Sequence, residues 1–334
     1  MFPPPSSESL IYQHSAELLA IHDALLRDEA RNRAFAAALE KHVTEDSVVL
    51  DIGSGTGLWA ILAAKLGARR VVAIEREGLI CGAIKELCRA NGVADRVQVI
   101  HGEAAQVDLP REFDIVISET VGHMIFDEQI VSLMVRAREH FLKPGGVMIP
   151  DRVALIAAPV NLGETATRWP VGIDLDYSPF QALSLHRPLA LTDKSRFQFL
   201  AEAKELVCSD LRTAQAPPDV KALAASWEIS DTEKLDGIAV WVEMRLIEGV
   251  ELSTLDTPSW SATVYRFAPF TAASGRLDFQ LELNASTNLW SGTLAGHVQR
   301  LSPAIAATRL ALQQQVDVGL MPHLPIHGGG PVFA

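Results

Sequence analysis

The chain has 334 residues, of which 48% are hydrophobic and 21% are charged, and its formal net charge is −12. This length allows a large buried core in one compact protein of two domains or layers. The acidic excess disfavours nucleic acid as a partner, because phosphates require basic surfaces. We expect no membrane segment, since no apolar stretch is long enough to span a bilayer and the N-terminal residues lack the pattern of a signal peptide.

The three cysteines predict neither a disulfide framework nor a zinc site. Cys81, Cys88 and Cys208 have no close CxxC spacing, so we expect buried or unreactive thiols. Such thiols fit a reducing compartment, and we expect a cytoplasmic protein.

Helix and strand patterns alternate over the first 150 residues. Apolar and alanine residues recur at helical spacing over 7–39, which predicts two helices or one that bends. Next come predicted strands at 47–51, 71–75, 97–100 and 113–118, with predicted helices at 58–65 and 78–90. A further helix after Glu128 is expected to end at the Pro-Gly-Gly of 144–146. The alternation predicts an α/β fold with a doubly wound parallel sheet and N-terminal helices.

The pattern changes after residue 150. Strand-like runs at 153–157, 238–246, 262–267 and 278–283 predict an antiparallel, β-barrel-like domain. We expect 214–219 to form a loop and 327–331 to be a mobile tail. The sequence therefore predicts two domains, residues 1–150 and residues 151–334.

A glycine-rich turn follows the first predicted strand. Its spacing is G-x-G-x-G, made by Gly53, Gly55 and Gly57, and Asp51 precedes it. The dinucleotide fingerprint has its third glycine one place later, so this spacing favours S-adenosylmethionine. Glu75, at the end of the next strand, can accept hydrogen bonds from ribose hydroxyls, and Asp51 can help to bind the methionine end.

Glu119 and Glu128 bracket a loop that follows the predicted strand 113–118. Two neighbouring carboxylates repel each other unless a proton or a cation lies between them. Guanidinium is the best-matched cation, because it is planar and carries forked N–H donors. The pair therefore predicts a binding site for the side chain of arginine.

Five segments together resemble the protein arginine methyltransferase family over about residues 10–155. They are 25–31, 51–57, Glu75, 118–128 and 150–152. The resemblance implies an S-adenosylmethionine-binding domain followed by a β-barrel domain, with S-adenosylhomocysteine as the product. It also implies a homodimer formed by a helical arm, which would lie near residues 172–194.

The resemblance also implies roles for single residues. His22 and Asp28 would lie on the N-terminal helix that covers the cofactor, and Arg31 would pair with the carboxylate of the cofactor. The residues that the family's pattern places beside the substrate are Tyr12, Leu25, Ile130 and Trp260. The chain departs from the family at Ser259, where a histidine would pair with Asp28, so a proton relay through that pair is in doubt.

The main hypothesis is an S-adenosylmethionine-dependent arginine N-methyltransferase that needs no metal. Glu119 and Glu128 would draw positive charge toward one guanidinium nitrogen and leave another free to attack the methyl group. The acceptor can be a protein, a peptide or free arginine, and the methylation pattern stays open. Two alternatives are a methyltransferase for another amine metabolite and a non-catalytic, cofactor-binding dimer.

Overall fold

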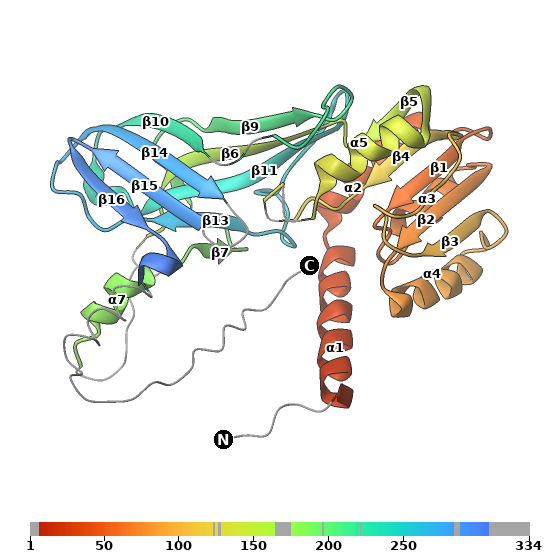
Figure 1. Cartoon of the computed structure of the whole chain (residues 1–334), viewed down its shortest axis with the longest axis horizontal. Helices are drawn as coiled ribbons and strands as arrows, with labels where there is room; N and C mark the ends of the chain where they lie inside the picture. Colours follow the sequence, from red (N-terminus) through yellow and green to blue (C-terminus); the bar gives the residue numbers. More distant parts are fainter. Residues whose placement is uncertain are drawn as a thin grey trace. The chain divides into compact units, whose positions relative to one another are not determined.

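The computed structural model describes residues 7–122, 124–125, 128–163, 175–195, 197–218, 220, 222–283 and 288–306. They fall into two compact units (Figure 1). The first unit comprises the described residues up to Ala154, together with Cys208–Pro217 and Val242–Trp260. The second comprises Leu155–Val207, Pro218–Trp241 and the described residues from Ser261 onward. The functional division at residue 150 stays a prediction.

Two helices precede the first strand: α1 (Ser7–Leu26) and α2 (Glu29–His42). They are separate because Asp28 is the N-cap of α2, and its side chain accepts a hydrogen bond from the backbone N–H of Arg31. Phe35, Ala38 and Leu39 form the buried face of α2. This helix contacts α3, β5 and β12 of the same unit.

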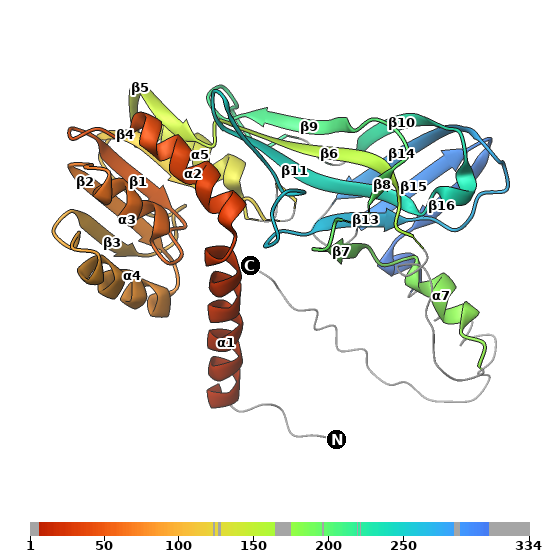
Figure 2. The same ribbon diagram turned by 180° about the vertical axis from the view of Figure 1, so that it is seen from behind.

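The first unit contains a parallel sheet with the strand order β3-β2-β1-β4-β5 (Figures 1 and 2). Its strands are β1 (Val48–Ile52), β2 (Arg70–Glu75), β3 (Val97–His101), β4 (Phe113–Ser118) and β5 (Leu142–Ile149). The helices α3 (Leu58–Lys65), α4 (Gly78–Ala90) and α5 (Ile130–His140) connect them. All five residues of β1 are buried, as in sheets covered by helices on both faces. The predicted α/β class is confirmed.

One expectation for this sheet is wrong. The Pro-Gly-Gly at 144–146 does not end α5, which already ends at His140, but lies inside β5. The pairing of β5 with β4 shifts its register between Phe113 and Ile115, so β5 bulges where the glycines are. Gly145 has a φ of 79°, and a Cβ on Gly146 would lie 3.0 Å from the carbonyl oxygen of Asp114. The glycines therefore permit a bulge here.

Antiparallel sheets follow, also as predicted. One has the order β10-β14-β15-β16, and the other has the order β7-β13-β11-β6-β8, with β12 paired to β11 and β9 to β6. The elements are β6 (Arg152–Asn161), α7 (Ser178–Ser184), β7 (Leu189–Leu191), β8 (Gln198–Phe199), β9 (Lys204–Asp210), β10 (Leu223–Ile229), a 3-10 turn (Thr232–Lys234), β11 (Gly237–Ile247), β12 (Val250–Ser253), β13 (Ala262–Arg266), β14 (Gly275–Leu283), β15 (Asn288–Leu294) and β16 (His297–Leu301).

Aromatic side chains fill the core of the second unit. Alternate residues of β14 are buried, which brings Phe279 to within 6.2 Å of Tyr265, measured between ring centroids. Tyr265 in turn lies 5.2 Å from Trp290, whose indole N–H donates to the carbonyl oxygen of Arg266 at 3.0 Å.

Among the described residues, no helix is long and apolar enough to cross a membrane.

Candidate active site

Three acidic residues lie where strands of the parallel sheet end. Asp51 precedes the last residue of β1, Glu75 is the last residue of β2, and Glu119 directly follows β4. In the register of β1 with β4, Ile52 lies opposite Ser118. The chain order of the strands reverses between β1 and β4, and ligands of such sheets bind outside the carboxyl ends of the strands at that point. The geometry therefore marks this edge as the candidate site.

The glycine-rich turn lets side chains pack directly on its backbone. Gly55 has a φ of 51°, and a Cβ there would lie 2.9 Å from Cε1 of His22. Gly57 has a φ of 75° and begins α3, and a Cβ there would lie 2.8 Å from Cγ2 of Ile84. A Cβ on Gly53 would collide with the side chain of Thr120. Larger residues would strain the turn, so the sequence requires glycines here.

Asp51 is fully buried below this turn. Its Oδ2 accepts a hydrogen bond from the backbone N–H of Ala60 at 3.1 Å. Its Oδ1 has no hydrogen-bond partner among the described residues. Burial, followed by the nearby charges of Glu75 and Glu119, raises the pKa of Asp51 to about 7, and hydrogen bonding opposes the rise. Asp51 is therefore a buried acceptor that would gain from a cationic partner.

Glu75 is held in place by two backbone groups. Its Oε2 accepts from the N–H of Gly55 at 2.8 Å, and its Oε1 accepts from the N–H of Glu77 at 2.9 Å. His22 lies near this carboxylate, and partial burial lowers the pKa of its imidazole, against the opposing charge of Glu75. The neighbouring guanidinium of Arg31 lowers that pKa further.

Arg31 is a buried cation that forms an ion pair with Glu119. Its Nη1 donates to the carbonyl oxygen of Leu25 at 3.0 Å and to Oδ1 of Asn32 at 2.8 Å, while its Nη2 donates to Oε2 of Glu119. The guanidinium carbon lies 5.3 Å from the ring centroid of Trp59 and 5.8 Å from that of Trp260. The Nε of Arg31 is buried without a hydrogen-bond partner among the described residues.

The two predicted substrate glutamates lie in different surroundings. The Glu119 side chain is only 10% exposed, and burial raises its pKa while Arg31 opposes the rise. Glu128 is exposed in the turn before α5. Ile130, the first residue of α5, is fully buried, and Leu25 is partly buried near the end of α1. Tyr12 lies in α1, but its side chain is outside the described part of the chain.

Ser259 takes up the hydrogen bond that the expected histidine would have made to Asp28. Its backbone N–H donates to Oδ2 of Asp28 at 3.1 Å, and its hydroxyl donates to the same oxygen. The other oxygen, Oδ1, caps α2 at Arg31. Asp28 is fully buried, so these bonds tie the start of α2, and with it Arg31, to the segment 242–260.

Sequence patterns did not indicate Trp59, although its ring centroid lies 5.3 Å from the guanidinium carbon of Arg31. It is buried in the first turn of α3 and stacks on Phe35 of α2, with ring centroids 4.9 Å apart. The available signal was a large aromatic residue two positions after the last glycine of the turn. Such a residue is usually interpreted as core packing.

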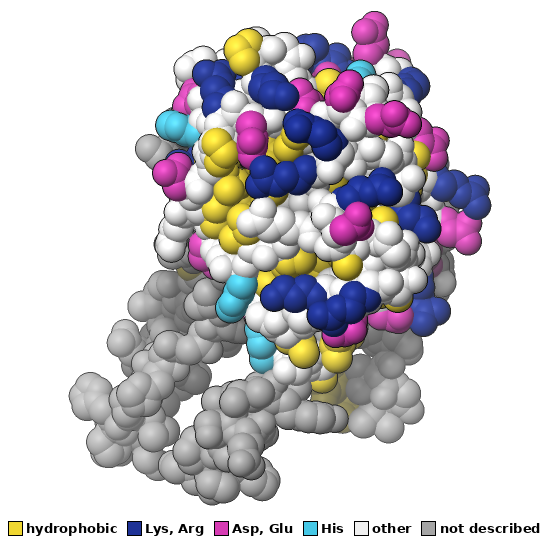
Figure 3. All heavy atoms as spheres, turned by 90° about the vertical axis from the view of Figure 1, so that its right-hand side faces the viewer, with side chains coloured by type: hydrophobic (Ala, Val, Ile, Leu, Met, Phe, Trp, Pro, Cys, Tyr) yellow, Lys and Arg dark blue, Asp and Glu magenta, His cyan; other side chains and the backbone are white. Residues whose placement is uncertain are grey.

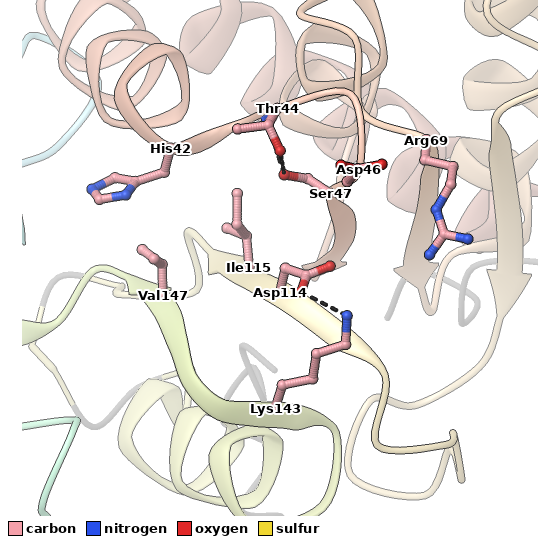
Figure 4. Close-up of a pocket in the computed structure, with 9 residues that line it drawn as sticks. All are labelled: His42, Thr44, Asp46, Ser47, Arg69, Asp114, Ile115, Lys143 and Val147. Carbon is pink, nitrogen blue, oxygen red and sulfur yellow. Dashed lines mark hydrogen bonds and ion pairs between the residues drawn. The ribbon is translucent and has the colours of Figure 1, made fainter.

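A hollow of about 470 Å³ lies at the opposite edge of the parallel sheet (Figure 4). Ser47 and Asp114, which line it, lie next to the first residues of β1 and β4. Asp114 accepts from Nζ of Lys143 at 2.6 Å and from the N–H of Val48 at 2.9 Å. These bonds tie β1, β4 and β5 together, which is a structural role away from the candidate site.

Comparison with known proteins identifies the family. Residues 49–146 match the model of a methyltransferase domain. Protein arginine N-methyltransferase 1 of Saccharomyces cerevisiae is 31% identical over 275 residues, which cover 77% of this chain and 77% of the yeast protein. The chain belongs to the protein arginine N-methyltransferase family. The relatives in this family are named as methyltransferases that act on nitrogen atoms of arginine.

Other members are similar over different lengths. A probable protein arginine N-methyltransferase 6 of Arabidopsis thaliana is 36% identical over 162 residues, which is 48% of this chain but only 37% of that protein. An arginine N(omega)-methyltransferase of Streptomyces achromogenes is 34% identical over 240 residues, or 70% of this chain and 66% of that one. The Trypanosoma brucei PRMT1 enzyme-prozyme heterotetrameric complex with AdoHcy shares the fold, with a TM-score of 0.71 at 23% identity, over 84% of this chain and 97% of the other.

The bonds between Ser259 and Asp28 predict a graded loss of stability. Ser259→Ala removes the hydroxyl donor but keeps the backbone donor, so we expect the free energy of unfolding to fall by about 1–3 kcal/mol. Asp28→Ala removes both bonds and the cap of α2, so the loss should be larger by about 1 kcal/mol or more. Urea denaturation measures both values. Equal stabilities of Ser259→Ala and the wild type would show that the hydroxyl bond does not hold α2.

Proposed function

We propose that this chain transfers a methyl group from S-adenosylmethionine to a guanidinium nitrogen of arginine. The observation that carries the proposal is a local excess of buried carboxyl groups over buried cations. Asp28, Asp51, Glu75 and Glu119 are buried or nearly so, whereas Arg31 is the one buried cation described in contact with this group. A sulfonium donor and a guanidinium acceptor both bring the positive charge that such a site lacks.

The described residues fit the amino-acid end of the donor. That end carries a carboxylate, which requires hydrogen-bond donors, and an ammonium group, which requires acceptors. Nε–H of Arg31 and Oδ1 of Asp51 have no hydrogen-bond partner among the described residues, and both atoms are buried. Each carboxylate oxygen has two lone pairs, so Glu75 can accept further hydrogen bonds. We expect it to accept these bonds from the ribose hydroxyls of the donor. His22 would pack over the glycine turn on the same ligand.

The donor supplies an electrophilic methyl group on a sulfonium sulfur. The residues of the chain would hold the guanidinium nitrogen in line with this methyl group, and the new N–C bond would form as the S–C bond breaks and leaves its electron pair on sulfur. Orientation of this kind can supply about 7–11 kcal/mol of the barrier in favourable cases. Glu119 and Glu128 would localise positive charge on the other nitrogens, and one of them would accept the proton that leaves.

The names of the relatives suggest two classes of acceptor. The yeast relative is named for protein arginine and the Streptomyces relative for arginine itself. We therefore expect activity on arginine peptides or proteins, or on free arginine. Lys and Arg side chains alternate with Asp and Glu on the face of the first unit in Figure 3, and the net charge is −12, so we expect no nucleic acid acceptor.

Replacement of either glutamate tests this function directly. We expect Glu119→Gln and Glu128→Gln to lower methyl transfer by about 100-fold or more, because each loses a charged acceptor for the guanidinium. Labelled S-adenosylmethionine, incubated with free arginine, arginine peptides and cell lysate, followed by mass spectrometry, reports the acceptor and the product.

Binding of S-adenosylhomocysteine should survive both substitutions, and Glu86→Gln, an exposed residue of α4, is the matched control. Full activity of Glu119→Gln would contradict the assignment of this residue. Transfer to a non-guanidino amine would instead support the alternative metabolite methyltransferase.

The pKa of Asp51 predicts that donor binding depends on pH. The ammonium group of the ligand stabilises only the ionised carboxylate of Asp51, whose pKa is about 7. At a pH below this value, ligand binding must therefore also remove a proton from Asp51. The dissociation constant for S-adenosylhomocysteine should therefore fall by about tenfold per pH unit as the pH rises toward 7, and then level off. Calorimetric titration of the wild type and Asp51→Asn checks this. Identical pH profiles for the two proteins would rule out Asp51 as the ammonium ligand.

We also infer that the chain forms a homodimer through the arm expected near residues 172–194. Residues 172–174 lie outside the described residues, but large apolar side chains of the remainder are exposed: Leu175 by 59%, Tyr177 by 42% and Phe180 by 54%. Leu19 and Ile21 of α1 are similarly exposed. Exposed apolar groups of this kind mark interaction surfaces.

A charge placed in the arm should dissociate the dimer. We expect sedimentation velocity to show a dimer for the wild type and for the control Gln215→Glu, which lies on an exposed loop of the first unit. Phe180→Asp should shift the protein toward monomer, because the carboxylate would lose its water on association. A wild-type monomer at micromolar concentration would contradict the proposal.

A further inference from the structure

We propose that Arg31 couples the two substrates, so that binding of the donor raises the affinity for the guanidinium acceptor and binding of the acceptor raises the affinity for the donor. This inference rests on the proposed function and adds a positioning role for Arg31, which acts through Glu119. Its starting point is that the buried guanidinium of Arg31 donates from Nη2 to Glu119, while its Nε–H has no partner in the part of the chain that the structure describes.

The guanidinium of Arg31 is anchored through Nη1, whereas Nε and Nη2 can change partners. Both hydrogen bonds of Nη1 go to atoms of the α1–α2 junction, at Leu25 and Asn32. Asn32 is itself held by the carbonyl oxygen of Leu26, to which its amide donates at 2.8 Å. Nε and Nη2 remain for anions, and these two nitrogens form the edge of a guanidinium that binds a carboxylate bidentately.

Two tryptophans restrict how Arg31 can respond. Trp59 and Trp260 lie beside its guanidinium, and both side chains are buried, at 3% and 4% exposed. A guanidinium packed against aromatic rings and anchored through Nη1 has little freedom to leave. It can still redistribute its remaining N–H groups between two carboxylates by small rotations. Arg31 can therefore be shared by Glu119 and a second anion.

Charge balance gives the sign of the coupling. Glu119 is nearly buried, so its ionised form requires a cation close by. The carboxylate of the methyl donor, bound at Nε of Arg31, would share the positive charge of Arg31 with Glu119. The charge of Glu119 would then be less fully compensated. Glu119 would then interact more favourably with an incoming guanidinium, which restores the balance. Because linkage is reciprocal, the acceptor must tighten donor binding by the same factor.

Calorimetry in the presence and absence of S-adenosylhomocysteine tests the coupling without measuring activity. The probes are L-arginine and a peptide with a single arginine. In the wild type we expect saturating S-adenosylhomocysteine to lower the dissociation constant of the bound probe at least about fivefold. The reciprocal titration should give the same factor and requires no variant.

Arg31→Lys keeps a positive charge near Glu119 but loses the planar fork, so the factor should fall below about twofold. The control is Arg33→Lys, which lies on the same helix, is exposed and pairs with Glu29 at 2.7 Å. It should retain the wild-type factor. If Arg31 has only a structural role, Arg31→Lys will weaken the binding of both ligands and leave the coupling factor unchanged. That result would overturn the inference.

The outcomes in the wild type separate this inference from the function on which it rests. Binding of both ligands with a factor near one would overturn the coupling and leave the methyltransferase function intact. Absence of S-adenosylhomocysteine binding would overturn both. A factor well below one would show that donor and acceptor compete for Arg31, which also contradicts the proposal.

Discussion

The ion pair between Arg31 and Glu119 is the interaction on which the rest of the site depends. A carboxylate that is only 10% exposed is costly to ionise unless a cation lies next to it. Arg31 supplies that cation, and its Nη1 donates to Leu25 of α1 and to Asn32 of α2. One side chain thus links the N-terminal helices to the end of β4. The same link makes Glu119 available as an anion at the carboxyl edge of the sheet.

Hydrogen bonds at the start of α2 hold Arg31 in position beside Glu119. Asp28 begins α2 and is held by Ser259, which is 231 residues further along the chain. The family pattern would place a histidine at this position. Ser259 instead donates to this carboxylate oxygen through its backbone N–H and its hydroxyl, and these two bonds hold Asp28 in position. The proton acceptors proposed above are therefore Glu119 and Glu128.

Local sequence patterns predicted the parallel-sheet unit well. The expected boundaries of 58–65, 78–90 and 113–118 coincide with α3, α4 and β4, because apolar periodicity and glycine turns are strong local signals. β5 was missed, since its Pro-Gly-Gly looks like a helix stop, and its strand character depends on pairing with β4. Short strands of mixed polarity, such as β9 and β16, were also missed, as their character comes from their partners.

Motif spacing was similarly informative for part of the site. The glycine turn and the acids at strand ends could be found, because each belongs to one local segment. The bond from Ser259 to Asp28 and the packing of Trp59 beside Arg31 join distant segments, so no local pattern contains them. The Arg31–Glu119 pair likewise joins residues 88 positions apart. Such contacts follow from the fold and are not visible in a single sequence.

A crystal structure of the protein with S-adenosylhomocysteine and an arginine peptide would test the central claim most directly. The account predicts that the ligand carboxylate lies about 2.7–3.2 Å from Nε of Arg31 and that the peptide guanidinium donates to Glu119. A ligand carboxylate bound away from Arg31, with Glu119 making no contact to the guanidinium, would contradict it.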